Sequence, residues 1–60
     1  MRCDICDKET PQEYFDAKTK QGPWATMCSW CFRQHGIGLG LGRGQRYQRN
    51  VQNNFVKTEG

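Results

Sequence analysis

The chain has 60 residues, of which 35% are hydrophobic, and its formal net charge at pH 7 is +3. A chain of this length forms one domain at most and buries only about 60% of the surface that it exposes when unfolded. It contains no apolar run of about 18 residues, so no membrane-spanning helix and no membrane partner are expected. A core built from so few apolar side chains needs a metal or disulfides for its stability.

The positive charge lies in the C-terminal half of the sequence. Residues 1–32 carry four cationic and five anionic side chains, whereas residues 33–60 carry five cationic side chains and one carboxylate, that of Glu59. A polyanionic partner should therefore meet the C-terminal half. The whole chain is less basic than its formula suggests, because four thiolates (−4) and one Zn²⁺ (+2) bring the net charge from +3 to about +1.

Two Cys-x-x-Cys pairs form the strongest motif. Cys3 and Cys6 are separated by 21 residues from Cys28 and Cys31. Each pair places two thiolates on one side of a tight turn, and two such turns complete a tetrahedral four-sulfur site. We therefore predict one structural Zn²⁺ on these four residues, with no open coordination position for catalysis. Disulfides and an iron centre are the alternatives, and the lack of an apolar leader after Met1 favours a reducing, cytoplasmic location.

The predicted elements begin with a zinc knuckle over residues 1–9, in which backbone N–H groups of the turn point at the sulfurs. Residues 13–19 alternate loosely between apolar and polar side chains, which indicates a strand, and residues 24–27 read as the returning strand. The sequence Lys-Gln-Gly-Pro at 20–23 is a turn signal. We therefore expect a β-hairpin over residues 13–28, with a loop longer than two residues.

A short helix is predicted from about Ser29 to His35. Ser29 is its expected N-cap, and Gly36 is its expected C-terminal stop. The start of this helix would place thiolates near the positive end of the helix dipole. His35 follows Cys31 by four residues and is expected at the helix end rather than among the zinc ligands.

Glycine occupies every second position from Gly36 to Gly44. The side chains between these glycines are those of Ile37, Leu39, Leu41 and Arg43. If this segment is extended, one face is bare backbone and the other is apolar and then cationic. Two interpretations stay open: the bare backbone lies against a nucleic acid or a partner strand, or the apolar side chains pack on the hairpin.

Residues 45–57 are rich in Asn and Gln. Tyr47, Val51 and Phe55 recur at four-residue spacing, which indicates a weak helix. The amide-rich composition indicates an irregular or disordered tail equally well.

Two zinc-finger architectures fit the ligand spacing. A zinc ribbon has two knuckles, usually with Gly soon after the second Cys, and here Asp7 and Phe32 follow the two pairs instead. A treble clef has one knuckle, a hairpin, and then a helix whose first turn supplies the second ligand pair. We therefore predict a small zinc-stabilised α+β fold of treble-clef type over residues 1–35, followed by a Gly-rich basic extension over residues 36–60. The zinc ribbon is the alternative.

Two segments carry a resemblance to known proteins: Trp-Ala-Thr-Met-Cys-x-x-Cys at 24–31, and the more distinctive Gly-Leu-Gly-x-Gly-x-Gly-Gln-x-Tyr at 38–47. Over roughly residues 3–47 the chain resembles short zinc-finger-like proteins of phage and prophage genomes. The resemblance implies a zinc module in a bacterial cytoplasm, and it transfers no catalytic residue.

No Ser/His/Asp or paired-carboxylate constellation is present, so no enzyme and no small-molecule substrate are expected. We expect a non-enzymatic structural zinc-finger protein that binds a macromolecule, with nucleic acid favoured. Arginine binds phosphate bidentately and tyrosine stacks on bases. The candidate nucleic-acid contacts are Arg33, Arg43, Arg46, Tyr47 and Arg49. The alternative is a phage-type interaction module that docks on a host or viral protein through Trp30, Leu39 and Leu41.

Overall fold

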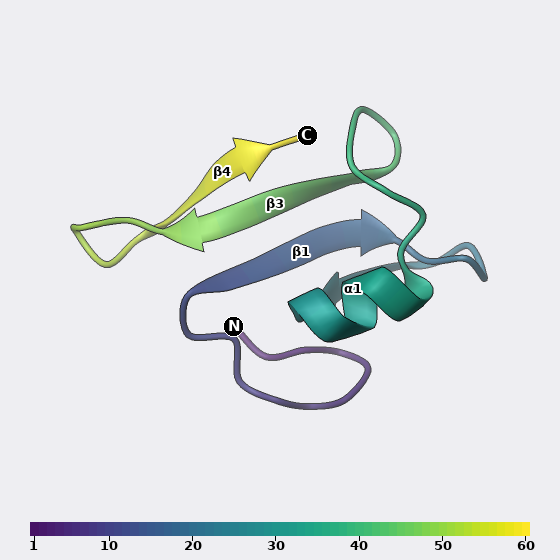
Figure 1. Ribbon diagram of the computed structural model, residues 1–60, viewed down its shortest axis with the longest axis horizontal. Helices are drawn as coiled ribbons and strands as arrows, with labels where there is room; N and C mark the ends of the chain where they lie inside the picture. The colour runs from purple at the N-terminus through teal and green to yellow at the C-terminus, as the bar shows by residue number, and fades with distance from the viewer.

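The computed structural model describes all 60 residues, as a four-stranded antiparallel sheet with one short helix on one side (Figure 1). The elements are β1 (Glu13–Lys18), β2 (Trp24–Met27), α1 (Ser29–His35), β3 (Gly44–Arg49) and β4 (Phe55–Glu59). The strand order is β2-β1-β3-β4, so the first strand of the sequence lies inside the sheet. The α+β prediction is confirmed at this level. The one helix is neither long nor apolar enough to span a membrane.

The predicted hairpin is confirmed. Phe15 of β1 lies opposite Met27 of β2, and Ala17 lies opposite Ala25, so the small and apolar side chains of the two strands share one face. A loop of residues 19–23 joins the strands, and the Thr19 backbone N–H and hydroxyl both donate to the Pro23 carbonyl, at 2.9 and 2.8 Å. These two bonds close the loop without needing a two-residue turn.

Helix α1 has the predicted bounds, but its N-cap is Cys28 and not Ser29. Cys28 has extended backbone angles (φ −73°, ψ 168°), and its Sγ accepts a hydrogen bond from the backbone N–H of Cys31. A thiol sulfur therefore replaces the hydroxyl oxygen that usually caps a helix. Gly36 ends the helix as predicted, and its N–H donates to the Phe32 carbonyl at 2.8 Å.

The core lies between α1 and the β1–β2 hairpin. The Phe32 ring stacks on the Phe15 ring, with 4.3 Å between centroids and 7° between planes. Only eight of the 60 residues are buried. The central apolar cluster consists of Cys3, Ala17, Met27 and Cys31. Since two of these four are predicted zinc ligands, the core and the candidate metal centre are one structure.

The Gly-rich segment is an irregular loop between α1 and β3, so it does not form the extended strand considered for residues 36–44. Gly38, Gly40 and Gly42 have φ values of 135°, 127° and 77°. Glycine adopts such positive φ values more readily than other residues, so the alternating glycines allow the backbone of the loop to change direction repeatedly. The Leu41 side chain is 96% exposed, which excludes the interpretation that it packs on the hairpin.

The weak helix over residues 45–57 is wrong, because this stretch forms the β3–β4 hairpin. Its turn is built from amides: the Asn50 Oδ1 accepts the backbone N–H groups of Gln52 and Asn54, each at 3.0 Å, and Asn53 has φ 71°. Asn is suited to both roles, so the composition reflects turn chemistry and not disorder. Tyr47 and Phe55 recur at helical spacing only because the turn returns them to the same side of the sheet.

Strand β3 also pairs with β1, which joins residues on both sides of the predicted division at residue 35 in one sheet. The register assigns each strand residue to a side, because paired residues point the same way. We call the side that packs on α1 the covered face. The open face carries the even-numbered residues of β1 and β2 and the odd-numbered residues 45–57 of β3 and β4.

Candidate metal centre

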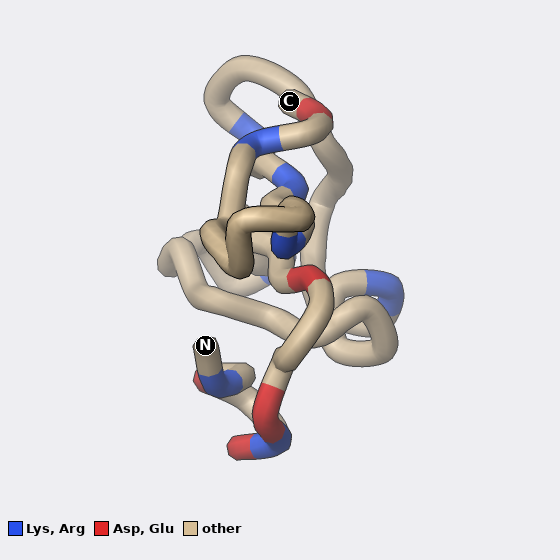
Figure 2. The backbone as a smooth tube through the Cα atoms, turned by 90° about the vertical axis from the view of Figure 1, so that its left-hand side faces the viewer, with Lys and Arg blue, Asp and Glu red and all other residues tan.

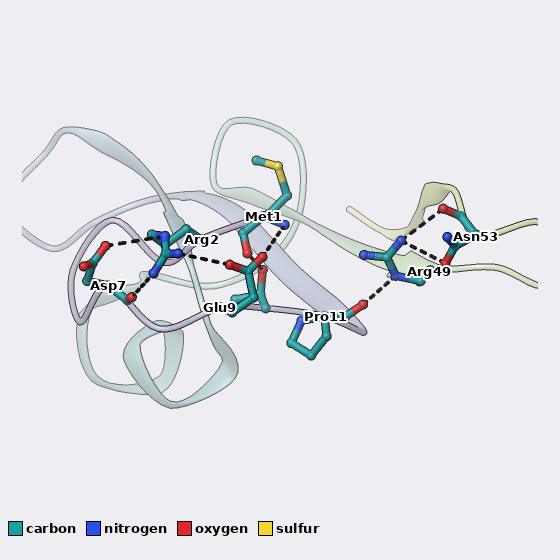
Figure 3. A network of polar contacts seen from close by, with 8 residues as sticks. Met1, Arg2, Asp7, Glu9, Pro11, Arg49 and Asn53 are labelled. Atoms are coloured by element: carbon teal, nitrogen blue, oxygen red, sulfur yellow. Dashed lines mark hydrogen bonds and ion pairs between the residues drawn. The ribbon is translucent and has the colours of Figure 1, made fainter.

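The first Cys-x-x-Cys pair lies in a tight loop that closes on itself. The Cys3 N–H donates to the Lys8 carbonyl at 2.8 Å, and the Asp7 N–H donates to the Cys3 carbonyl at 3.1 Å. Arg2 braces the loop from outside, with Nη1 2.8 Å from the Asp7 carbonyl and Nη2 3.4 Å from the Glu9 carboxylate (Figure 3). The ion pairs of Arg2 with Asp7 and Glu9 are exposed and contribute less than about 1 kcal/mol each, so the backbone bonds define the loop.

Asp4 holds this loop against strand β2. Its backbone N–H donates to the Thr26 carbonyl at 2.7 Å, and its Oδ2 accepts the Thr26 N–H at 2.9 Å. Thr26 is two residues before Cys28. The contact therefore brings the first cysteine pair beside the start of α1, where the second pair lies.

The four Sγ atoms lie within 4.8 Å of one another, and those of Cys6 and Cys28 are 3.7 Å apart. A tetrahedral Zn²⁺ with Zn–S bonds of about 2.3 Å has S···S edges of about 3.8 Å. The cluster therefore fits a single Zn²⁺ held by Cys3, Cys6, Cys28 and Cys31. No histidine belongs to the cluster, and His35 lies at the other end of α1.

Backbone N–H groups surround the sulfurs. The Cys3 Sγ accepts from Ile5 and Cys6 at 3.4 and 3.5 Å, and the Cys28 Sγ accepts from Cys31 at 3.5 Å. Such bonds disperse thiolate charge and orient the ligands. The hydrogen bonds predicted for the knuckle over residues 1–9 are therefore present, and one bond of the same kind reaches the second pair.

The surroundings of the cluster shift the pKa values of the Cys3 and Cys31 thiols in opposite directions. Burial opposes ionisation of Cys3, but the backbone N–H groups of Cys6, Cys28 and Ile5 outweigh it and lower its pKa to about 6. Burial raises the pKa of Cys31, and the neighbouring thiols raise it further. A cysteine binds Zn²⁺ as a thiolate, so metal binding at this cluster releases thiol protons, including that of Cys31, whose pKa burial raises.

One side of the cluster opens to solvent. Cys3 and Cys31 are buried, whereas Cys6 is exposed and Cys28 is partly exposed. A hollow on this side is lined by Cys6, Lys8, Cys28 and Trp30. The Trp30 side chain is 58% exposed, so it flanks the site without sealing it.

The residues predicted to contact nucleic acid do not form one cluster. Arg46 lies between two carboxylates on the covered face, 2.8 Å from both Glu13 and Glu59. Its hydrogen bonds to Glu59 and then Glu13 raise the pKa of the guanidinium. Arg33 is exposed on α1, and Arg43 is exposed in the Gly-rich loop.

Arg49 has structural partners as well. It donates to the Pro11 carbonyl at 2.6 Å and to the carbonyl and side chain of Asn53 at 3.1 and 3.0 Å (Figure 3). Its guanidinium also lies 4.4 Å from the centroid of the Phe55 ring. Arg49 therefore ties the start of β1 to the β3–β4 turn.

Tyr47 is on the open face, beside two further aromatic residues that are not among the predicted nucleic-acid contacts, Tyr14 and Phe55. Tyr14 stacks on Tyr47, with 5.0 Å between centroids and 9° between planes, and its ring meets Phe55 edge to face at 4.9 Å. Tyr14 directly precedes Phe15, and neighbouring residues of a strand point to opposite sides, so the sequence held a signal for this placement. The β3–β4 hairpin, which brings Phe55 to the open face, has no comparable signal in the sequence, because residues 45–57 indicate a helix or a disordered tail.

The residues of the alternative protein-docking surface come from separate segments. Trp30 is on α1, whereas Leu39 and Leu41 are in the Gly-rich loop, where Leu39 is partly buried and Leu41 is almost fully exposed.

Charge is distributed unevenly over the fold. Near the N-terminus, cations and carboxylates alternate closely along the chain, whereas Lys and Arg predominate over much of the rest (Figure 2).

Comparison with protein-family models, curated proteins and solved structures finds no match to this chain. The resemblance to phage and prophage zinc-finger-like proteins thus gains no support from these comparisons.

Proposed function

We propose that this chain is a non-enzymatic structural zinc-finger protein of treble-clef type that binds a nucleic acid through its C-terminal half. The treble-clef interpretation is supported by the order of parts: a cysteine loop, the β1–β2 hairpin, and a helix with Cys28 as its N-cap and Cys31 in its first turn. The zinc assignment is supported by the four clustered sulfurs. Four thiolates fill the coordination sphere of Zn²⁺, which favours a structural over a catalytic metal.

The observation that carries the nucleic-acid proposal is the surplus of unmatched cations. Of nine Lys and Arg side chains, Arg2 and Arg46 form ion pairs, which leaves seven without one. Ion pairs engage four of the six carboxylates, which leaves only Asp4 and Asp16. Asp4 accepts a hydrogen bond from Thr26, so local anions neutralise little of this surplus. Phosphate groups complement such a surface.

The test is the salt dependence of binding. Fluorescence anisotropy would follow the zinc-loaded protein binding a labelled single strand of about 12 nucleotides, from about 50 to 200 mM salt. Each phosphate contact contributes about 0.7 to the slope of log affinity against log salt on single strands. Arg43 and Lys57 are exposed and have no ion pair, so replacing both with Gln should flatten the slope by about 1.4.

A matched control is available in the N-terminal half. Arg2→Gln combined with Lys8→Gln also removes one arginine and one lysine. The slope of log affinity against log salt should then stay close to that of the wild type. Absence of any binding at about 50 mM salt would contradict the proposal, as would equal flattening by the two double variants.

A second candidate function is docking on another protein, which the 58% exposed Trp30 beside the cysteine cluster favours. In that case Trp30→Ala should abolish partner binding and leave the zinc content unchanged. Binding would then show a shallow salt dependence, because no phosphate contact is lost with rising salt.

A further inference from the structure

The open face gathers one aromatic side chain from each strand of the sheet. Tyr14 of β1, Tyr47 of β3 and Phe55 of β4 form the contacting group described above, and Trp24 of β2 lies farther along the same face, opposite Lys18. Trp24 is 46% exposed. No helix packs on this side, since α1 contacts the sheet through the covered face. The sheet therefore holds the rings in place, with Trp24 exposed and Tyr14, Tyr47 and Phe55 partly exposed.

The charge on the open face is positive. It carries Lys18, Arg49 and Lys57 against one carboxylate, Asp16, and no ion pair forms among them. On the covered face, by contrast, Arg46 is engaged by two carboxylates. Cations interleaved with aromatic rings are the chemistry that binds a single-stranded nucleic acid, because phosphates meet the cations while unpaired bases stack on the rings.

We propose that the open face binds single-stranded RNA, with bases stacked on Trp24 and on the ring cluster of Tyr14, Tyr47 and Phe55. This inference rests on the proposed function, names its substrate class, and extends its site from the C-terminal half to strands β1 and β2. Tyr14 and Lys18 are four residues apart on β1, which corresponds to about 13 Å, so the face accommodates more than one base. A duplex is a poorer ligand, because its base faces are already stacked.

Asp16 is the reason for choosing RNA over DNA. It lies between Thr26 and Gln45 in the middle row of the face, with neither an ion pair nor a side-chain hydrogen bond. A carboxylate among phosphate-binding cations repels a polyanion unless the ligand brings a donor. The ribose 2′-hydroxyl is such a donor, and deoxyribose lacks it. Thr26 and Gln45 offer further polar groups to the same sugar.

The first experiment compares Tyr47→Leu with Tyr47→Phe in the zinc-loaded full chain. The probe is a labelled RNA single strand of about 12 nucleotides, with DNA of the same sequence and duplex RNA alongside. Leu keeps an apolar side chain but removes the ring, so RNA affinity should fall about tenfold while the salt slope stays constant. Phe keeps the ring and should bind as the wild type does. Trp30→Leu, which removes an exposed ring from outside the open face, should also leave affinity unchanged.

A second measurement does not depend on altering the ring cluster. In Trp30→Phe the only tryptophan is Trp24, and RNA should quench its fluorescence as a base stacks on it. In Trp24→Phe the only tryptophan is Trp30, and RNA should leave its emission unchanged. Zinc content and thermal unfolding confirm that each variant is folded.

The outcomes separate this inference from the proposed function. Failure of every nucleic acid to bind at low salt overturns both. Binding of RNA that leaves Trp24 emission unchanged and tolerates Tyr47→Leu overturns the open face alone, and quenching of Trp30 would move the site to the metal centre. DNA bound as tightly as RNA, or Asp16→Asn improving both equally, overturns the assignment to RNA.

Discussion

The two faces of the sheet are built from alternate residues of the same strands, and they differ in packing and in charge. On the covered face Phe15 stacks under Phe32, the cysteine cluster completes the core, and the Arg46 charge is matched by two carboxylates. On the open face Tyr14 and Tyr47 stack without a covering layer, and none of the cations forms an ion pair. The packed core thus lies on one side of the sheet, and the side chains to which we assign binding lie on the other. Neighbouring residues of one strand point to opposite sides.

The largest expected effect concerns the covered face. Removing zinc with a chelator should unfold the whole domain, because metal binding in small zinc modules contributes on the order of 10 kcal/mol and only eight residues are buried. Ser in place of any one of Cys3, Cys6, Cys28 and Cys31 should have a comparable effect. Native mass spectrometry should show one zinc per chain, and circular dichroism should show loss of structure on chelation.

His35→Ala is the control for this prediction, and its zinc stoichiometry should equal that of the wild type. A cooperative thermal transition in excess chelator would show that the covered face does not depend on the metal. Loss of zinc from the His35 variant would show that the ligand set differs from the four cysteines.

The next effect compares one substitution on both faces. Phe32→Ala removes the ring that stacks on Phe15 and should destabilise the zinc-loaded protein by about 3 kcal/mol. Phe55→Ala removes an edge contact to Tyr14 and the cation–π contact to Arg49, and should cost about 1 kcal/mol. Urea unfolding in the presence of zinc measures both changes. Equal losses would mean that the open face is a second core and not a binding surface.

The smallest effect distinguishes matched from unmatched cations. Arg46→Gln should leave the salt slope of RNA binding unchanged, since its guanidinium faces Glu13 and Glu59 on the covered side. Lys57→Gln removes a free cation from the open face and should flatten the slope by about 0.7. A slope that responds to Arg46 and ignores Lys57 would place the ligand on the wrong side of the sheet for our inference.

Much of the first half of the fold follows from local sequence signals. The spacing of the cysteine pairs predicts the metal cluster, because each pair needs only a tight turn to present its thiols. The bounds of the hairpin and of α1 also follow, since alternation, the Gly-Pro turn and Gly36 act over a few residues. The N-cap at Cys28 was missed because preferences based on hydroxyl and carboxylate side chains do not consider a thiol acceptor.

The second half was decided by tertiary structure. The four-residue spacing of Tyr47, Val51 and Phe55 suits a helix, but Asn50 and Asn53 form a turn between two strands, and β1 offers β3 a free edge for pairing. Local spacing does not reveal such a partner, which lies from 27 residues (Ala17 and Gly44) to 35 residues (Glu13 and Gln48) away in the sequence. Pairing with β1 placed Tyr47 beside Tyr14 and turned Arg46 toward Glu13. The sequence by itself therefore determined the candidate metal ligands, whereas the sheet register decided which cations remain free and which rings share a face.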